Sequence, residues 1–546
     1  MIEILLFSII TNLMFYSYGN LTSHKKNTNR TDDLIKKSII GIIIVSLISL
    51  FANFLIPLNK LFNTSLLIIG LTILLYQKKL KFNKNEIIFI LVSGLVTFSL
   101  LIFSNNNRPD AGLYHLPYTN ILNDYKIIFG VSNIHFRFGH ISIMQYLSAI
   151  NNNYLFGNSG IVIPLASSAS FFIIYFFNNV LGIFRNKNEI DLSKVFSIFV
   201  IIFISYKINR YSSFGNDALA HLSFFYLISI LLKKDKPELN FIYLICVFIF
   251  LNKPLMIIVF IIPLLIFIRY YNRKNLKLLF SMPTFLLILW LTKNIAVSGC
   301  AIYPVKITCI NSLKWTDLNE VHLESRSGEA WSKGWPDRKD NNISFNDYNK
   351  NFNWYKTWSK KHGKFIVSIL FPYILVALVI AYLISGKSKS DFKMFKNFDF
   401  FYFISFFVSI IGSLIFFLKF PIFRYGYSFL VSSIILSTFF AIQRINLKNI
   451  TKITKVIFLI CIVAFFGKQA VRSVKNYSNK DIWPNIYSFN KNIKPKISKV
   501  NISNYLDIYT TNHLCMYNKS PCTNYKLKNI NIEKKQSYLF INLSEK

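Results

Sequence analysis

A carboxylate that could take part in catalysis occurs in the motif DAGLYH, at residues 110–115. Asp110 follows the fourth hydrophobic segment of the chain, and His115 lies a little over one helical turn later. A carboxylate at a membrane surface can act as a general base toward a hydroxyl group. Asp is also a favoured helix N-cap, so Asp110 could instead cap the helix that follows. We favour the catalytic role for Asp110 and a solvated helix position for Asp124.

The motif HFRFGH places His135, Arg137 and His140 among aromatic residues. An arginine flanked by imidazoles can bind a phosphate group. The alternative is an interfacial turn, because aromatic side chains concentrate at the boundary between membrane and water. Gly139 makes a continuous helix between the two histidines unfavourable, so their spacing predicts no metal geometry.

A second acid and imidazole pair ends the stretch NRYSSFGNDALAH, where Asn216 and Asp217 open a hydrophobic segment and His221 follows. Residues four apart share one face of a helix, so Asp217 and His221 should point the same way. Such a pair could polarise a hydroxyl group or hold a metal ion. The alternative is a helix cap with a satisfied interfacial histidine.

Two cations lie in turns between later hydrophobic segments. Lys253 is in LNKP, and Arg424 precedes Tyr425 in FPIFRYGYSFL. Arginine binds phosphate through two parallel hydrogen bonds and keeps its charge when partly buried, so Arg424 is the better phosphate ligand. Both residues could also be anchors that extend toward the membrane surface.

The segment 296–364 combines aromatic and ionisable residues. It contains five of the seven tryptophans of the chain. Aromatic rings beside acids can grip a sugar ring, and they are equally typical of a loop that settles into the membrane interface. Both interpretations are open. The ionisable residues are Asp317, Glu320, His322, Glu324, Glu329, Asp337 and Asp340.

The elements that must position these residues are membrane helices. Of the 546 residues, 53% are hydrophobic and only 16% are charged, against about 25% charged residues in soluble domains. About fourteen hydrophobic segments approach the length needed to span a bilayer. They are 2–18, 38–57, 62–76, 86–104, 160–184, 193–206, 217–232, 239–252, 254–270, 278–296, 365–385, 399–418, 425–442 and 454–468.

The distribution of charge predicts the orientation. The net charge is +38, but Lys and Arg concentrate in alternate connections between hydrophobic segments, as the positive-inside rule predicts for a membrane protein. Nucleic acid is therefore not an expected partner. The Lys-rich connections should be cytoplasmic, and both termini should be outside, with the long segments 105–159, 296–364 and 471–546. Composition favours a bacterial inner membrane with periplasmic termini.

We therefore expect an all-α polytopic membrane protein with about fourteen transmembrane helices. The stretches 113–127 and 139–151 should form amphipathic interfacial helices in the first large outside loop, and strand-like runs near the C-terminus predict a small periplasmic α/β cap. The expected units are the N-terminal helices 1–104, the outside loop 105–159, the transmembrane core 160–296, the periplasmic loop 297–364, the C-terminal helices 365–470 and the periplasmic domain 471–546.

The cysteines agree with an oxidising outside compartment. Cys300 and Cys309 share one outside segment, and Cys515 and Cys522 share another. Two short-loop disulfides are the favoured interpretation. Pairing between the two segments is the alternative, and the spacings do not fit a zinc site.

This combination of features resembles the GT-C superfamily of polytopic glycosyltransferases, which includes protein O-mannosyltransferases, aminoarabinose transferases and RgtA/B/C/D-like enzymes. The run DAGLYH looks like the first-loop acid of that family, Asn216 and Asp217 look like its second-loop acid site, and Arg424 with Tyr425 looks like its Arg-Tyr pair. The family usually places its catalytic loop after the first span, often with paired acids. Here the loop follows the fourth segment, and Asp110 stands alone.

The resemblance implies an inverting transfer of a sugar from a polyprenyl-phosphate donor to an envelope glycan, lipid or protein acceptor. Asp110 would be the general base, and Arg424 with Arg137 or Lys253 would stabilise the leaving phosphate. Asp217 and His221 would orient the acceptor or bind a divalent cation, Mg²⁺ or Mn²⁺, and His115, His135 and His140 would contact substrate. Membrane lipids are the expected surroundings.

Three other classes of function are compatible with the sequence, and one of them is a structural membrane protein without catalysis. An O-antigen polymerase or ligase would depend on Arg137, Arg424 and the histidines rather than on Asp110. A transporter or flippase would show inverted repeats and charged or broken helices at the membrane midplane. Neither feature is evident here, and the ionisable groups gather at one membrane face.

Overall fold

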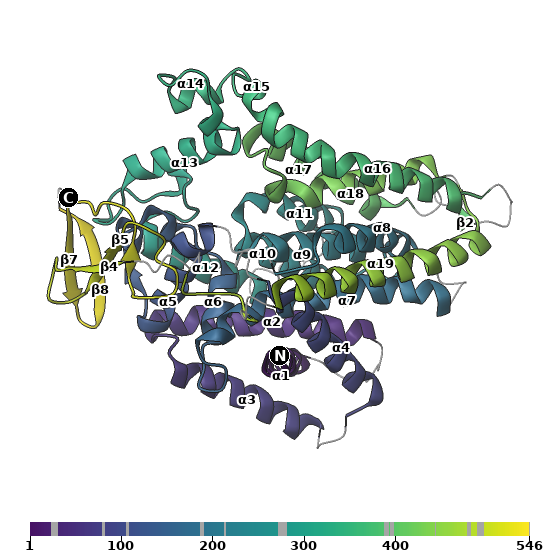
Figure 1. The fold of residues 1–546 in the computed structure, drawn as a ribbon, viewed down its shortest axis with the longest axis horizontal. Coiled ribbons are helices and arrows are strands. Elements are labelled where there is room, and N and C mark those ends of the chain that lie inside the picture. Colours follow the sequence, from purple (N-terminus) through teal and green to yellow (C-terminus); the bar gives the residue numbers. More distant parts are fainter. Residues whose placement is uncertain are drawn as a thin grey trace.

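A computed structural model describes residues 1–22, 31–78, 82–104, 109–185, 190–211, 215–270, 281–386, 392–393, 398–442, 444–477, 482–488 and 496–544 (Figure 1). A helix occupies each hydrophobic segment that the sequence predicts. Residues 212–214, within the second acid motif, and most of the connection 270–280 lie outside the described residues. The helices are α1 (Ile2–Asn20), α2 (Thr31–Leu55), α3 (Lys60–Lys78), α4 (Lys84–Leu101), α7 (Ile163–Arg185), α8 (Leu192–Lys207), α9 (Asp217–Leu231), α10 (Leu239–Asn252), α11 (Ile261–Arg269), α12 (Met282–Ser298), α16 (Lys364–Ile384), α17 (Phe400–Lys419), α18 (Phe423–Ala441) and α19 (Leu447–Asn476).

Eight helical stretches among the described residues are long and apolar enough to cross a membrane. They make the chain a helical, multi-pass membrane protein. The stretch that contains α7 is almost entirely buried within the bundle. By contrast, α16, α17 and α19 expose apolar side chains along one face, as lipid-facing helices do. The helices α9, α10 and α12 are apolar but shorter.

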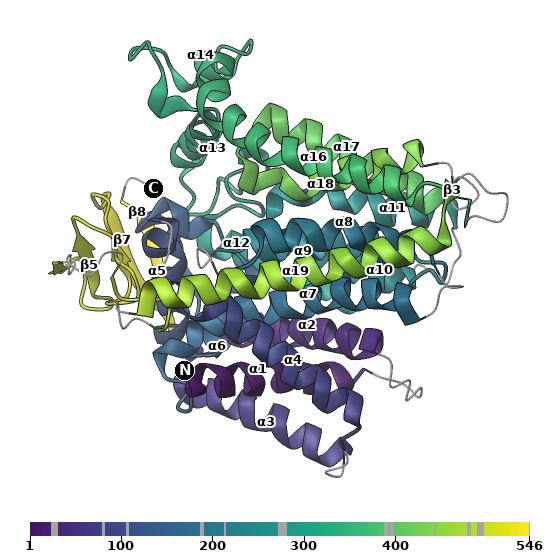
Figure 2. The same ribbon diagram turned by 45° about the vertical axis from the view of Figure 1, so that its right-hand side comes forward.

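Most of the irregular segments, and all of the described strands except β2 and β3, gather at one end of the bundle (Figure 2). Both chain ends lie there, together with the π-turn η1 (Ala111–His115), α5 (Leu116–Asp124), α6 (Ile143–Ile150) and α13 (Leu318–Ser332). The short strands β2 (Phe392–Lys393) and β3 (Arg444–Ile445) pair at the opposite end. The long segments that the sequence places outside therefore share one end of the molecule.

The helices α5 and α6 are more deeply buried than interfacial helices would be. Every residue of α6 is buried, and so is every residue of α5 except Asp124. α6 packs against α2, α5 and α7, while Asn120 and Tyr125 hydrogen-bond to the C-terminal segment. The amphipathic pattern is real, but protein rather than water covers its polar side.

The C-terminal segment forms strands that pack onto the first long loop. One sheet has the order β1-β8-β7, in which β1 (Ile128–Phe129) pairs in parallel with β8 (Tyr538–Leu543), and β7 (Ile530–Lys535) pairs antiparallel with β8. The other sheet has the order β4-β5-β6. No helix accompanies these strands within residues 482–488 and 496–544. The bounds of β4, β5 and β6 are Ile497–Val500, Ile508–Thr511 and Cys522–Thr523.

Each of the two cysteine-containing segments that the sequence predicts to lie outside contains a disulfide. Cys300 is bonded to Cys309 and Cys515 to Cys522. Cys246 and Cys461 are free and buried. The first disulfide closes the loop that follows α12, and the second joins the turn after β5 to β6.

Candidate functional site

Asp110 lies between two arginines that come from distant parts of the chain. Its Oδ1 accepts a hydrogen bond of 3.0 Å from Nη1 of Arg137, and its Oδ2 accepts one of 2.9 Å from Nη1 of Arg424. Arg137 belongs to the 3₁₀ turn η3 (Phe136–Gly139), and Arg424 lies in the first turn of α18. The Asp110 side chain makes no capping hydrogen bond to η1. The two ion pairs, rather than capping, therefore account for its position.

A third ion pair lies beside these two. Nζ of Lys253 is 2.7 Å from Oδ1 of Asp217 and donates a hydrogen bond of 3.0 Å to the carbonyl oxygen of Arg424. Lys253 occupies the turn after α10, and Asp217 is the first residue of α9. The side chain of Asn216 donates to the carbonyl oxygen of Asn252 in the same turn. The start of α9, the end of α10 and the start of α18 thus meet.

His221 holds the backbone of α18 in place. Its Nε2 lies 2.9 Å from the carbonyl oxygen of Arg424, and its Nδ1 lies 2.7 Å from Oγ of Ser428. A carbonyl oxygen can only accept, so Nε2 carries the hydrogen and Nδ1 accepts from the serine hydroxyl. Both nitrogens are occupied, and the ring packs on Tyr427 with centroids 3.9 Å apart. His221 therefore positions Arg424 and does not face a ligand.

Aromatic rings surround the ion pairs. Nη2 of Arg424 donates a hydrogen bond of 3.1 Å to the hydroxyl of Tyr425, and Nζ of Lys253 lies 4.4 Å from the centroid of the same ring. Tyr114 packs on His115, with ring centroids 4.1 Å apart, and Arg137 lies 5.7 Å from the Tyr114 ring centroid. Aromatic faces attract cations, so these rings help to hold the arginines and the lysine.

The electrostatics of the loop favour a charged Asp110 and a neutral His115. Burial acts to raise the pKa of Asp110, but the guanidinium groups of Arg424 and Arg137 outweigh it and hold that pKa below its ordinary value. Burial lowers the pKa of His115 to about 4. At neutral pH the site therefore presents a carboxylate between two guanidinium groups.

The structure brings together most of the residues that the sequence singles out. Asp110, Arg137, Arg424, Asp217 and Lys253 form what we call the charged cluster. His115, His140, Asn216, His221 and Tyr425 lie around it, as the contacts above and the position of His140 beside Tyr114 show.

His135 is engaged elsewhere. Its Nε2 lies 3.2 Å from Oδ1 of Asn524, in the C-terminal segment, and its ring packs on Tyr525. It is 2% exposed. Its contacts fasten the C-terminal segment to the first loop, so we assign it no contact with substrate.

Sequence reasoning missed Ser428 and Tyr303 at or beside the cluster, and it named Glu324 only as one of several acids in its segment. Ser428 holds His221, Glu324 lies 3.3 Å from Nε2 of His140, and the ring of Tyr303 packs edge-on to His140 with centroids 5.1 Å apart. Spacing along the chain gives no signal for these contacts. Glu324 occurs among many ionisable residues of its segment, so only the three-dimensional arrangement distinguishes it.

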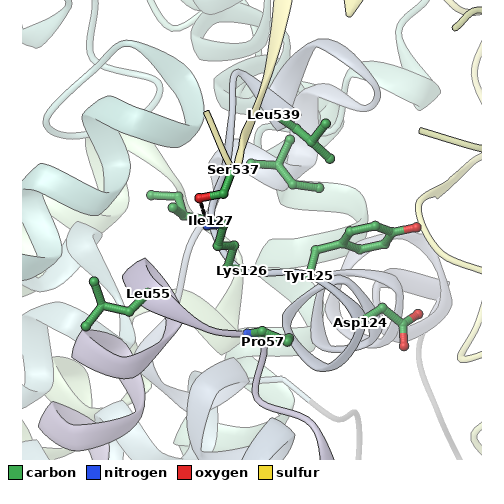
Figure 3. A pocket seen from close by; sticks show the side chains of 9 residues that line it. Leu55, Pro57, Asp124, Tyr125, Lys126, Ile127, Ser537 and Leu539 are labelled. Atoms are coloured by element: carbon green, nitrogen blue, oxygen red, sulfur yellow. Dashed lines mark hydrogen bonds between the residues drawn. The ribbon is translucent and has the colours of Figure 1, made fainter. Parts of the chain in front are cut away.

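A pocket with a volume of about 370 Å³ lies elsewhere (Figure 3). It lies between the end of α2, the end of α5 and β8, and both apolar and polar side chains line it. Nζ of Lys126 donates a hydrogen bond to Oγ of Ser537 across it. No residue of the charged cluster lines it. The lining residues are Leu55, Pro57, Asp124, Tyr125, Lys126, Ile127, Ile128, Ser537 and Leu539.

Among the described residues, no group of three or more His, Cys, Asp or Glu side chains is placed to hold a metal ion. Asp217 and His221 share a helix face, as expected, but each has its own partners. Asp217 pairs with Lys253, and His221 contacts the Arg424 carbonyl oxygen and Ser428. They do not converge on a common point.

Comparison with known proteins gives a family without an assigned activity. No curated protein and no solved structure matches the chain. The family described as "Domain of unknown function (DUF8201)" matches residues 1–431, which include every residue of the charged cluster. Since this match covers most of the sequence, the chain belongs to the DUF8201 family.

Proposed function

We propose that the charged cluster transfers a sugar from a polyprenyl-phosphate donor to a hydroxyl group of an envelope acceptor, as the resemblance to GT-C glycosyltransferases implies. The observation that carries the proposal is the contact of Asp110 with both Arg137 and Arg424. It sets a carboxylate next to two guanidinium groups. In such a transfer the carboxylate can serve as the base, and the guanidinium groups can bind the phosphate.

The ion pairs suggest how the cluster changes when the donor enters. Guanidinium groups bind phosphate through parallel hydrogen bonds, so the donor phosphate competes with Asp110 for Arg424 and Arg137. Once the arginines bind phosphate, the oxygens of Asp110 become available to a hydroxyl group. In the resting state the carboxylate compensates the two partly buried positive charges, which would otherwise be costly.

The chemical step then follows in a single displacement. The acceptor oxygen attacks the anomeric carbon while the bond from that carbon to the phosphate oxygen breaks. Asp110 takes the proton of the acceptor hydroxyl, and the phosphate leaves with its charge stabilised by Arg424. Lys253, paired with Asp217 and bonded to the Arg424 carbonyl, keeps Arg424 in position. The configuration at the anomeric carbon inverts.

The proposed setting is a bacterial inner membrane, with the charged cluster and both chain ends on the periplasmic side. The cluster lies at the end of the bundle that carries the long segments and the disulfides. Disulfides persist in oxidising compartments such as the periplasm. Access from the bilayer suits a donor with a polyprenyl tail.

Reconstitution with radiolabelled polyprenyl-phosphate sugars tests the proposal. We expect label to move to extracted envelope acceptors, with inverted configuration in the product. We also expect Arg424→Ala to weaken donor binding, while Arg444→Ala, at the opposite end of the bundle, does not. The absence of transfer with every donor, or unchanged donor binding by Arg424→Ala, would contradict the proposal.

A further inference from the structure

A second group of polar side chains adjoins the charged cluster at Arg137. His140 lies three residues after Arg137, and its Nε2 lies 3.3 Å from Oε1 of Glu324 on α13. The ring of Tyr303 packs edge-on to the His140 ring, with centroids 5.1 Å apart. The chain thus brings α13 and the disulfide-closed loop to the site from more than 150 residues away.

Two polar atoms in this group have no hydrogen-bond partner among the described residues. The Tyr303 side chain is 7% exposed, and its hydroxyl makes no hydrogen bond. Nε of Arg137 is also buried and unpaired. Leaving a buried polar group without a hydrogen-bond partner is unfavourable, so these two atoms, on residues beside His140 in the chain and in space, indicate a polar ligand that would supply their missing partners.

The surrounding structure holds Tyr303 firmly. The disulfide between Cys300 and Cys309 closes the loop that contains it. Its ring also lies directly on Gly139, where a Cβ atom would be 2.7 Å from the ring. A larger residue at that position would displace the ring. The unpaired hydroxyl is therefore not the end of a freely moving side chain.

The available groups match a ligand with several hydroxyls. Glu324 can accept hydrogen bonds, His140 can donate or accept at Nδ1, and the Tyr303 hydroxyl and Arg137 Nε can donate. The His140 side chain is 35% exposed and Glu324 14%, so a ligand can reach both. Tyr114, Tyr303 and His140 add ring surface. A sugar ring can use both the ring surfaces and the polar groups, whereas a protein acceptor would offer only the single hydroxyl of a side chain. The site therefore suits a carbohydrate acceptor better than a protein acceptor.

We propose that His140, Glu324 and Tyr303 form the acceptor subsite, and that the acceptor is a carbohydrate. This inference rests on the proposed glycosyl transfer and specifies its acceptor. In this arrangement α13 selects the acceptor sugar, while the arginines bind the donor. Glu324 orients the His140 ring through Nε2 and leaves Nδ1 for a sugar hydroxyl.

Binding of free sugars to the detergent-solubilised full chain tests the subsite. We would record saturation-transfer difference NMR with a panel of hexose and N-acetylhexosamine disaccharides. At least one should bind to the wild-type protein. Tyr303→Phe removes only the hydroxyl, so we expect the Kd to rise about tenfold with no loss of thermal stability. Glu324→Gln should weaken binding at least as much.

The matched control is Glu320→Gln, one turn earlier on α13. Glu320 pairs with Lys528 at 2.8 Å, so this variant should bind the sugar like the wild type. The proposal is overturned if the wild-type protein binds no sugar, or if Tyr303→Phe and Glu324→Gln bind as it does. It is also overturned if Glu320→Gln loses as much affinity as they do.

The carbohydrate subsite and the proposed glycosyl transfer can fail independently, and the two failures give different experimental results. If the protein transfers sugar to Ser- or Thr-containing peptides but binds no free sugar, the carbohydrate subsite is wrong and glycosyl transfer stands. If sugars bind with the expected variant pattern but no donor is turned over, the subsite stands as a binding site and the proposed function fails.

Discussion

At the scale of single residues, His115 and His135 of the first loop differ from Asp110 in what burial does to their charge. Asp110 keeps its charge because arginines contact both of its oxygens. Burial lowers the pKa of His115 to about 4 and that of His135 to about 3. Both imidazoles are therefore neutral at physiological pH, when an ordinary histidine is partly protonated.

These values predict how stability depends on pH. An unfolded chain protonates histidine below about pH 6.5, whereas folded His115 and His135 stay neutral until about pH 4 and 3. The unfolded state therefore binds more protons in this window, and stability falls as the pH falls. We expect the apparent Tm in detergent to decrease from pH 7 to pH 4.5.

Replacement of His135 isolates the contribution of this residue to the pH dependence of stability. His135→Gln should have a shallower decrease of Tm over the same pH range, since it removes one group that must otherwise be charged on unfolding. His322→Gln, at an exposed position of α13, should keep the wild-type slope. An unchanged slope in His135→Gln would show that His135 does not titrate in this way.

At the scale of elements, α1 and α2 pack as closely as two backbones can. A Cβ atom on Gly19 would meet the carbonyl oxygen of Lys37, and one on Gly41 would meet that of Phe15. Small residues at such crossings let membrane helices approach each other, and van der Waals contact then holds them together. The N-terminal segment is thus an integral helix of the bundle.

This crossing predicts a cost for the smallest substitution. Gly41→Ala should separate α1 from α2 and lower the Tm in detergent, because overpacking a close contact costs about 1–3 kcal/mol. Gly467→Ala is the matched control, since a Cβ atom there has open space around it in α19. It should be neutral or slightly stabilising. Equal Tm values for the two variants would contradict the close crossing.

At the scale of the whole molecule, the sequence predicts the helices well and the contacts of the site less well. Long apolar runs must form helices in a bilayer, so a helix appears at every predicted segment. Asp110, Asp217 and Arg424 could be identified because ionisable residues are rare beside such runs. Glu324 and Tyr303 could not, since they reach His140 across a separation that local patterns do not encode.

The same reasoning explains the outcome for individual histidines. The imidazole of His221 was expected at the site and is there, but it supports Arg424 through its carbonyl group. His135 fastens the C-terminal segment instead. Residue type and spacing show where an imidazole lies along a helix or loop. They do not show which segment from elsewhere in the chain covers it.

The arrangement of the molecule predicts its orientation in the membrane. Lys339, in the segment after α13, and Lys234, in the connection between α9 and α10, are both exposed. An impermeant maleimide should label Lys339→Cys in intact spheroplasts, and Lys234→Cys only after permeabilisation. The free cysteines Cys246 and Cys461 are buried, so background should be low. The reverse pattern would contradict a periplasmic site.

The most direct test of the central claim is the rate of sugar transfer by Asp110→Asn, measured beside Asp124→Asn in reconstituted membranes. Asp124 is an exposed acid of the same loop that lies outside the charged cluster. Since a general base contributes about 10²–10⁴-fold, we predict that Asp110→Asn loses transfer by that factor while it stays folded, with a Tm below that of the wild type because Arg137 and Arg424 lose their compensating charge. Asp124→Asn should keep the wild-type rate. Full transfer by Asp110→Asn would contradict the account.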